Sequence, residues 1–454
     1  MVEGAAGAAA GKVHGHWSSR MGFIIAAVGS AVGLGNVWKF PYMVGQSGGA
    51  AFVLVYLACI AMIGLPIIVA EWLIGRRGQK NPVNSMAELA RTNGRSRLWI
   101  TVGITGTLAG FLILSFYSVI GGWALAYLGD AASGSLAGID KAGAGALFDD
   151  LLADPGSLLV WHTLFMAITI GIVARGVTGG IERAARLLMP ALGVILLVLV
   201  GYGMSTDGFG AAVSYLFSPD WSKLTGEVLL AALGHAFFTL SLGMGVMMAY
   251  GSYLGEEVNL LWAARTVAIA DTVIALAAGL AIFPIVFANG LDVGAGPGLV
   301  FVTLPLAFGG ITGGSILASL FFALLVFAAI TSAISLLEPA VELMEERTPL
   351  NRLGATAVTG LAVWALGISA LLSFNAWSDV LIFGSNVFDL LDRLTSKFLL
   401  PLTGLGAVLF VAWRLERNGV QRELKLGDTG FSIWQLVARF VAPIGVLIVF
   451  ISSL

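Results

Sequence analysis

Charged residues are scarce in this chain. Asp, Glu, Lys and Arg make up 11% of its 454 residues, whereas a soluble domain carries roughly 25%. The 24 basic and 26 acidic side chains nearly cancel, to a net charge of −2 at pH 7. The sequence therefore lacks the basic excess that nucleic-acid binding requires. Because 58% of the residues are hydrophobic, the shortage of charge indicates a polytopic membrane protein.

Cysteine is almost absent as well. Cys59 is the only one and lies in an apolar run, so an intrachain disulfide is excluded. Residues 1–15 lack the apolar core of a cleavable signal peptide. These residues are rich in Ala and Gly, and we expect them to form a flexible cytoplasmic tail.

Long apolar runs are what the chain has in abundance. A helix that spans a bilayer needs about 20 residues, and eleven runs are long enough. They lie near 20–44, 48–74, 98–128, 158–175, 181–203, 227–254, 260–288, 313–343, 353–374, 386–413 and 431–453. Between them, residues 129–157 are Gly/Ala-rich and acidic and predict a solvent loop, and residues 289–312 predict a folded external loop.

Basic residues are distributed unevenly between the two sides that these spans define. With the N-terminus inside, 19 of the 24 Lys and Arg residues lie in inner segments, in accord with the positive-inside rule. We therefore expect a multi-pass protein of the inner (plasma) membrane with a cytoplasmic N-terminus. Eleven spans place the C-terminus on the extracellular side.

Two of the apolar runs are interrupted at their middle by a Gly-rich hexapeptide. The first is SAVGLG at 30–35, and the second is LSLGMG at 240–245. Unwound backbone is tolerated in a membrane only where protein or a watery cavity satisfies it, and paired interruptions point to a transporter's binding site. The exposed helix ends offer N–H groups to an anion and carbonyls to a cation, which suits a zwitterionic amino acid. The alternative is that these glycines only allow close helix packing.

Five motifs then follow one another along nearly the whole chain. They are WSSRMGFIIAAVGSAVGLGNVWKFPYMVGQSGGAAF from Trp17, GLPIIVAEWLIGR with Glu71, SFYSVIGGW with Tyr117, FFTLSLGMG with Phe238, and AAITSAISLLEP from Ala328. Through these motifs the chain resembles the neurotransmitter:sodium symporters, especially bacterial sodium-coupled amino-acid transporters of the leucine-transporter type. The resemblance implies an all-α membrane fold of two inverted five-helix repeats with broken helices 1 and 6. The repeats would occupy 16–203 and 204–413, followed by an additional C-terminal helix at 414–454.

The resemblance also implies two sodium sites. Their chemistry is reasonable, because a hard cation prefers several oxygen ligands. The first site would comprise the Ala31 carbonyl, Asn36, Thr239, Asp271 and the substrate carboxylate. The second would comprise the carbonyls of Gly29, Val32 and Ala328 with the hydroxyls of Thr331 and Ser332. Without the resemblance, the two hydroxyls could bond to their own helix and Asp271 could pair with a base, although an intramembrane carboxylate is a functional candidate by default.

Asp271 is where the sequence departs from the family it resembles. Relatives usually have Asn at this position, and chloride-dependent members have Ser one turn later, where this chain has Ala275. A fixed negative charge at Asp271 would take the place of chloride. We therefore expect transport that does not depend on chloride.

The resemblance places the substrate between the two interrupted helices. The residues expected to bind it are Gly29, Ser30, Gly33, Leu34, Gly35, Ile113, Tyr117, Phe238, Ser241, Met244, Ser332 and Leu336. Tyr117 would donate to the substrate carboxylate, Phe238 would close the pocket from outside, and Met244 is an adaptable side chain. Because this lining has no charged residue, we expect neutral hydrophobic L-amino acids, aliphatic and aromatic. Ordinary core packing is the alternative for Phe238 and Met244.

The gates are less clearly indicated. Lys39 follows the first interruption, and Asp389 or Asp392 would be its acidic partner. On the inner side, Trp17 and Arg20 would pair with the span that ends at Glu345 and Glu346. In span 5, Gly180 and Pro190 enclose Glu182, Arg183 and Arg186, which prefer water, so this segment is expected to unwind and hydrate the second sodium. The alternative is a static kink, which is common in membrane helices.

Other functional classes remain to be compared. A proton-coupled amino-acid transporter or exchanger on the same fold would lack one or both oxygen clusters. A channel would show a repeated filter or a ring of like charges, and an enzyme would show a catalytic signature such as HExxH; the sequence shows neither. The best-supported prediction is a sodium-coupled amino-acid symporter in a lipid bilayer, with an oligomeric state that the sequence does not specify.

Overall fold

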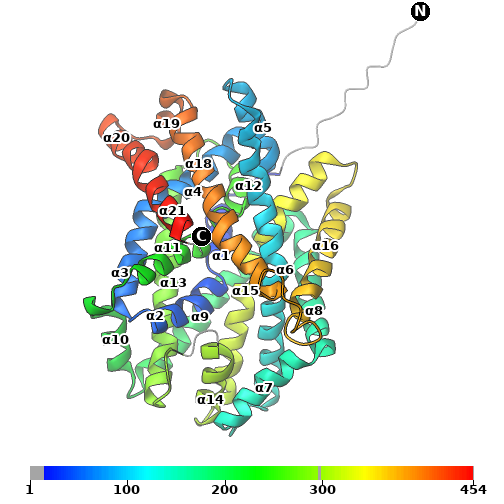
Figure 1. Cartoon of the computed structure of the whole chain (residues 1–454), viewed down its shortest axis with the longest axis vertical. Helices are drawn as coiled ribbons and strands as arrows, with labels where there is room; N and C mark the ends of the chain where they lie inside the picture. The colour runs from blue at the N-terminus through cyan, green and yellow to red at the C-terminus, as the bar shows by residue number, and fades with distance from the viewer. Residues whose placement is uncertain (1–14, 295–297, 453–454) are drawn as a thin grey trace, which may run out of the picture.

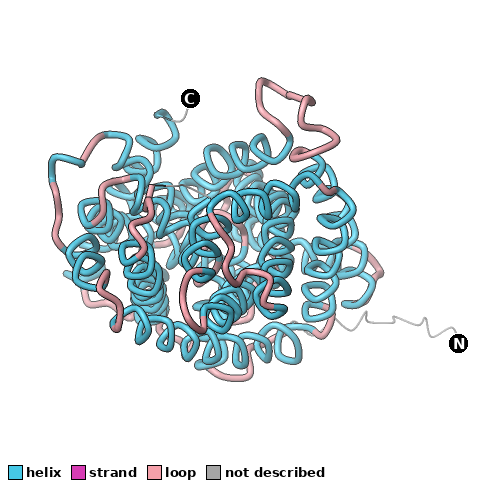
Figure 2. The backbone as a smooth tube through the Cα atoms, turned by 90° about the horizontal axis from the view of Figure 1, so that it is seen from below, coloured by secondary structure: helices cyan, strands magenta, loops and turns pink. Residues whose placement is uncertain are grey.

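The computed structural model describes residues 15–294 and 298–452 of the chain. In these residues the regular secondary structure is helical, apart from one isolated β-bridge between Ile382 and Ser385. Figure 1 shows α5 (Pro82–Thr92), α19 (Arg417–Leu424) and α20 (Asp428–Leu436) at one end of the bundle, and α7 (Lys141–Ala153) and α14 (Leu304–Gly309) at the other. Figure 2 shows many of the helices between these ends nearly end-on.

Nine helical stretches among the described residues are long and apolar enough to cross a membrane. They are Ala50–Gly78, Arg97–Ser133, Pro155–Val173, Val177–Met204, Leu260–Ala288, Gly314–Arg347, Arg352–Leu372, Val387–Arg414 and Asp428–Ser452. They contain the helices α3 (Ala50–Cys59), α4 (Leu65–Gly78), α6 (Ile100–Ser133), α8 (Pro155–Val173), α9 (Arg183–Met204), α13 (Leu260–Ala288), α15 (Gly314–Arg347), α16 (Arg352–Leu372), α17 (Val387–Leu394), α18 (Leu400–Arg414) and α21 (Ala442–Ser452).

The first predicted span is broken where the sequence indicated. Helix α1 (Arg20–Ala31) ends at the Gly-rich segment, and the chain resumes as the π-helical turn η1 (Gly35–Lys39) and α2 (Phe40–Gln46). The two parts are bent by 44°. Val32 has an extended conformation, with φ −80° and ψ 98°, so the helical hydrogen-bond pattern stops there. Counted as one span, the bent pair brings the total to ten.

The second break divides the sixth predicted span. Helix α11 (Gly226–Thr239) and α12 (Val246–Ser252) are each too short to cross a bilayer. Between them Ser241, Gly243 and Gly245 have positive φ of 53°, 74° and 73°, values that terminate a right-handed helix and favour glycine. The eleven predicted spans are consistent with the nine continuous stretches and these two interrupted pairs.

The connecting segments contain more structure than the sequence indicated. Residues 129–157, predicted as a solvent loop, include the end of α6 and the helix α7. The predicted external loop folds into η6 (Leu299–Thr303) and α14, with Phe301 fully buried against the rings of Trp38 and Trp123. Pro297, on which that prediction partly depended, lies outside the described residues.

The two long helices α6 and α15 pack along each other and support both breaks. Gly110 of α6 lies so near the second break that a Cβ on it would come within 2.8 Å of the Met244 carbonyl oxygen. Helix α15 likewise packs on α1. The breaks are therefore held at the centre of the bundle, away from lipid, where unwound backbone can be tolerated.

Candidate functional site

A small cavity of about 20 Å³ lies between the two breaks. It is lined by Ser30, Ala31, Gly33, Leu34, Gly35, Ile113, Tyr117, Phe238, Ser241, Met244, Ser332 and Leu336. Every residue expected to bind substrate is in this lining except Gly29, and Ala31 is present in addition. Gly29 instead faces Met189 and Thr331, since a Cβ built on it would be 3.4 Å from each of those side chains.

The polar groups of the cavity are hydroxyls and backbone. The Leu34 N–H donates to the Tyr117 hydroxyl over 3.3 Å. A Cβ on Gly33 would be 2.2 Å from Ser332 Oγ and 3.2 Å from the Tyr117 hydroxyl oxygen, so a side chain at that position would have to displace the Ser332 hydroxyl. The remaining lining is apolar, and no charged side chain contributes to it.

The two breaks are bonded to each other through Ser30. Its carbonyl oxygen accepts a 2.9 Å hydrogen bond from Ser241 Oγ in the second break and a 3.1 Å bond from Ser332 Oγ on α15. A helix interior would use this carbonyl itself, so the interruption is what frees it. One backbone oxygen thus joins the first break, the second break and α15.

The first predicted oxygen cluster is assembled around Asp271, which is fully buried on α13. Its Oδ1 accepts 2.8 Å hydrogen bonds from Asn36 Nδ2 and Thr239 Oγ1. Thr239 Oγ1 also lies 3.4 Å from Asn36 Oδ1, so the side-chain oxygens of the three residues converge. Ala31, the fourth predicted member, lines the adjacent cavity.

Tyr56 on α3 belongs to the same cluster and was not anticipated from the sequence. Its hydroxyl donates a 2.9 Å hydrogen bond to Asp271 Oδ2. Within the described part of the chain, the donors to this carboxylate are the neutral side chains of Tyr56, Asn36 and Thr239. An ionised carboxylate at this buried position would need a positive partner. A sodium ion beside Asp271 Oδ1 would supply that partner.

The second predicted cluster is assembled around Thr331 on α15. Its Oγ1 lies 3.4 Å from the Val32 carbonyl oxygen, 3.0 Å from that of Ala328 and 3.1 Å from that of Phe327. One hydroxyl hydrogen serves only one of these acceptors at a time, so the group has surplus lone pairs, as a cation site requires. The back-bonding alternative for Thr331 is present in the same contacts. Ser332, also predicted here, directs its hydroxyl to Ser30 instead.

Glu71 supports the second break from α4. Its Oε1 accepts a 2.8 Å hydrogen bond from the backbone N–H of Gly243, and its side chain is fully buried. The sequence motif includes Glu71 without indicating this role. An intramembrane carboxylate is a signal that could have singled it out, but its partner is 172 positions away.

Comparison with known proteins decides the family. Residues 14–139 and 146–454 match the sodium:neurotransmitter symporter family. The chain belongs to this family. It is 38% identical over 440 residues to the uncharacterized sodium-dependent transporter YhdH of Bacillus subtilis. The matched residues cover 96% of this chain and 97% of YhdH. An uncharacterized sodium-dependent transporter of Haemophilus influenzae is 36% identical over 447 residues, or 96% of this chain and 98% of that one.

A solved structure of the family has the same fold. The structure of MhsT in complex with L-phenylalanine matches with a TM-score of 0.90 and 47% identity, over 97% of this chain and 100% of that chain. The predicted fold class, an all-α membrane protein of two inverted repeats with two broken helices, is confirmed. This symporter is accordingly a sodium-dependent, multi-pass membrane transporter of a small molecule, and not an enzyme.

On one side of the cavity of this symporter, Phe238 lies between the other lining residues and Lys39. The Lys39 Nζ lies 4.4 Å from the centre of the Phe238 ring, a cation–π contact. Neither carboxylate predicted as the partner of Lys39 forms an ion pair with it among the described residues. Asp392 accepts from Ser396 Oγ, and Asp389 accepts from Asn386 Nδ2.

On the other side, the residues just before α1 are bonded to spans 5 and 6. Trp17 Nε1 donates to the Tyr250 carbonyl over 3.1 Å, and the Ser18 N–H donates to Glu182 Oε2 over 3.0 Å. The interpretation of Glu182 as a water-seeking residue is wrong: its side chain is 2% exposed, because Ser18 and Arg186 satisfy its carboxylate. The segment from Gly180 to Pro190 is helical here, in η4 (Val177–Glu182) and α9.

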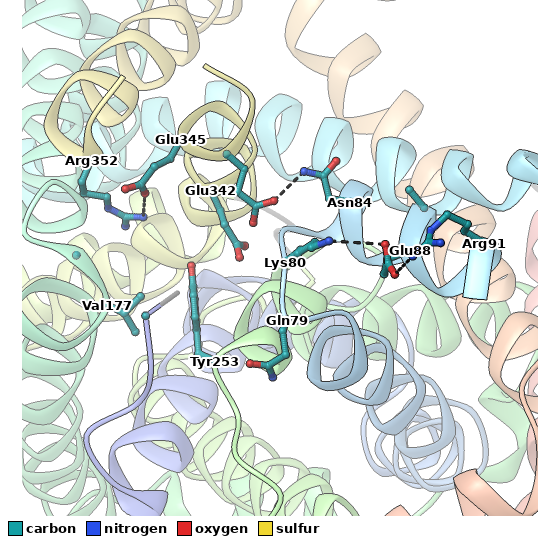
Figure 3. Close-up of a pocket in the computed structure, with 14 residues that line it drawn as sticks. Gln79, Lys80, Asn84, Glu88, Arg91, Val177, Tyr253, Glu342, Glu345 and Arg352 are labelled. Carbon is teal, nitrogen blue, oxygen red and sulfur yellow. Dashed lines mark hydrogen bonds and ion pairs between the residues drawn. The ribbon is translucent and has the colours of Figure 1, made fainter. Parts of the chain in front are cut away.

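A second cavity, of about 720 Å³, lies beside the residues that precede α1 and is lined in part by Gly15 and Tyr253. Figure 3 shows Tyr253, Glu342 and Arg352 on one side of it, and Lys80 and Arg91 flanking Glu88 on the other. The hydrogen bond from Arg91 is the main cause that lowers the pKa of the Glu88 carboxyl below its ordinary value.

The inner pairing expected for Arg20 is wrong. Its guanidinium lies 3.8 Å from the centre of the Trp262 ring. Of the two carboxylates expected to meet it, Glu345 lies 3.7 Å from Arg352, and Glu346 accepts from Asn81 and Asn84. Each carboxylate has a nearer partner on a neighbouring element, so Arg20 stacks on an aromatic ring instead.

Proposed function

We propose that this symporter carries neutral, hydrophobic L-amino acids, aliphatic and aromatic, into the cell with sodium and without chloride. The observation that carries the proposal is the cavity between the two breaks, whose lining has hydroxyls and backbone groups but no charged side chain. Free N–H groups and carbonyls at helix breaks suit the charged ends of an amino acid. An uncharged lining then favours an apolar side chain.

The similarity to MhsT supports the aromatic part of the proposal, because that protein's structure was determined in complex with L-phenylalanine. A cavity of about 20 Å³ is too small for such a side chain, so its lining must move outward when substrate enters. Phe238 and Met244 are the lining residues best suited to do so, since both are long side chains with several rotamers.

Two oxygen clusters support coupling to two sodium ions. The group at Asn36, Thr239 and Asp271 contains a buried carboxylate, and the group at Val32, Ala328 and Thr331 is neutral. A chloride ion would be repelled by Asp271, and Ala275, one turn along α13, has no hydroxyl to bind it. These features support transport without chloride.

The same proposal includes the orientation, with a cytoplasmic N-terminus and an extracellular C-terminus in the plasma membrane. It rests on the distribution of Lys and Arg between the two sides.

The test is uptake of radiolabelled phenylalanine, leucine, lysine and glutamate by purified protein in liposomes, with sodium, potassium and proton gradients imposed separately. We expect a sodium gradient alone to drive accumulation of phenylalanine and leucine, unchanged when gluconate replaces chloride. Accumulation driven equally by a proton gradient would instead indicate the proton-coupled alternative. Preference for lysine or glutamate would overturn the substrate class.

A further inference from the structure

The loop between α16 and α17 is unusually apolar for a connecting segment. Residues 373–386 read SFNAWSDVLIFGSN, with Asp379 as the one charged residue in this range. Its large apolar side chains are exposed: Trp377 40%, Val380 44%, Leu381 62%, Ile382 41% and Phe383 93%. A contiguous exposed apolar surface of this kind marks contact with a partner or with a membrane.

The loop ends in a two-residue hairpin that holds Phe383 outward. Ile382 and Ser385 exchange backbone hydrogen bonds of 2.8 and 3.1 Å, and the two residues between them, Phe383 and Gly384, have φ of 53° and 77°. Such tight turns normally contain Gly, Asn or Asp at both central positions. A bulky residue with positive φ is a true outlier, and it points to a role for the side chain that is presented there.

The base of the loop is fixed to the helical bundle. The Phe388 N–H donates to Ser373 Oγ over 3.1 Å, and Asn375 Nδ2 donates to the Leu152 carbonyl at the end of α7 over 2.8 Å. The rings of Phe374 and Phe388 lie 5.0 Å apart, and Phe388 lies 5.4 Å from Phe116 of α6. The direction of the exposed tip is therefore set by the fold.

The loop joins two candidate membrane spans, Arg352–Leu372 and Val387–Arg414, so it lies where these two helices would leave a membrane. Figure 1 draws it in orange in front of the bundle, and Figure 2 shows a loop on that same side extending beyond the rim of helices. Helix α8, which begins three residues after the Leu152 that bonds the loop base, has an exposed apolar surface, with Val160 63% and Leu164 43% exposed. Aromatic residues such as Trp377 are typical of the membrane–water boundary.

We propose that residues 376–384 are an interfacial anchor that lies in the lipid bilayer, at the boundary between headgroups and acyl chains. With the orientation proposed above, this is the outer leaflet. Lipid is the occupant because the exposed apolar residues lie between two candidate membrane spans, Arg352–Leu372 and Val387–Arg414, in a loop bonded at its base to Leu152, just before α8. The anchor leads directly into α17, which carries Asp389 and Asp392, so it fixes the depth of that helix start in the membrane.

The anchor is tested by the depth of a label at its tip. In a Cys59→Ala background, Phe383→Cys is labelled with an environment-sensitive fluorophore and reconstituted into phosphatidylcholine liposomes. Val160→Cys on α8 is the bilayer reference, and Ser222→Cys, in the exposed turn after α10 (Phe209–Phe217), is the aqueous reference. Leu381→Cys is the second position should Phe383→Cys fail to fold.

We expect lipids with a nitroxide just below the headgroup to quench the tip label several-fold more than the Ser222→Cys label, and aqueous iodide to quench it several-fold less. Iodide quenching equal to that at Ser222→Cys would overturn the anchor. Shielding that disappears when protein is diluted with lipid would also overturn it, because the tip would then contact a second copy of the chain.

Discussion

The hydroxyl of Tyr56 donates a 2.9 Å hydrogen bond to Oδ2 of Asp271, while Asn36 and Thr239 occupy Oδ1. The carboxylate of Asp271 is thus bonded to Tyr56 of α3, whereas Asn36 and Thr239, the other members of its oxygen cluster, lie on other elements. One oxygen is committed to Tyr56, and the other faces the converging oxygens. This division orients the charge toward the proposed sodium position and leads to the first two predictions.

We expect Asp271→Asn to weaken sodium-dependent phenylalanine binding on the order of tenfold or more, because a charged interaction contributes about 1.5–3 kcal/mol. The substitution removes the fixed negative charge but keeps the shape of the side chain. Binding to purified protein is measured against sodium concentration, with chloride and with gluconate. The variant should gain a response to chloride. Loss of wild-type binding in gluconate would contradict the role assigned to Asp271.

Tyr56→Phe should weaken sodium dependence in the same direction but less, since the charge stays and only one hydrogen bond is lost. The ring and its contacts with Phe40 and Phe52 are retained, so the fold should persist. The readout is the same sodium titration, with thermal stability measured in parallel. A variant that is less stable but has unchanged sodium dependence would show that Tyr56 serves the fold alone.

Lys39→Gln should release bound substrate faster, by roughly two- to tenfold, because an exposed or partly desolvated cation–π contact contributes about 0.5–1 kcal/mol or somewhat more. Lys39→Arg preserves the positive charge above the Phe238 ring and should release substrate at nearly the wild-type rate. Dissociation of radiolabelled phenylalanine in sodium measures both. Equal rates in the wild type and Lys39→Gln would mean that Phe238 closes the cavity without help from Lys39.

Gly33→Ala should abolish substrate binding, whereas Gly29→Ala should largely preserve it. A methyl at 33 would lie 2.2 Å from Ser332 Oγ, but one at 29 would meet its neighbours at 3.4 Å. The two variants make the same chemical change, one at a residue that lines the cavity (Gly33) and one at a residue that does not (Gly29). Binding of phenylalanine at saturating sodium distinguishes them, and similar losses in both would contradict the close approach at Gly33.

The last prediction concerns the inner route. Pro190→Ala restores a backbone hydrogen bond in α9 and should slow turnover while leaving substrate binding largely intact. Unwinding of this segment would also release Glu182 from Ser18, which frees the start of α1. Hydrogen exchange across 180–190 should be faster in potassium than in sodium. Unchanged turnover, with equal exchange in both ions, would identify Pro190 as a static kink.

Local sequence was sufficient to predict the two breaks. Gly-rich segments recur at the middle of two apolar runs, which favours helix breaks over close helix packing, so the interruptions at 30–35 and 240–245 could be located directly. The cavity lining followed from the resemblance, and all of it except Gly29 surrounds the observed cavity. Whether these residues bind substrate stays a prediction.

The side-chain partners were less predictable. Tyr56 meets Asp271 across 215 positions and Glu71 meets Gly243 across 172. Tyr56 lies in none of the five motifs, and the motif that contains Glu71 does not indicate its partner. The predictions for Arg20 and Glu182 were wrong for a related reason. Arg20 stacks on Trp262, and Glu182 is bonded to Ser18. A long polar side chain can reach several possible partners, and these partners come within reach only when the helices pack together.

The Ser30 carbonyl, which accepts from both Ser241 and Ser332, has a consequence for leakage. A symporter wastes its ion gradient if it returns half-loaded, so slippage must be made unfavourable. When one atom belongs to the geometry of both breaks and of α15, displacing any of the three disturbs the other two. We expect partially loaded forms to be poor at changing sides, which is how strict stoichiometry can arise without a separate checkpoint.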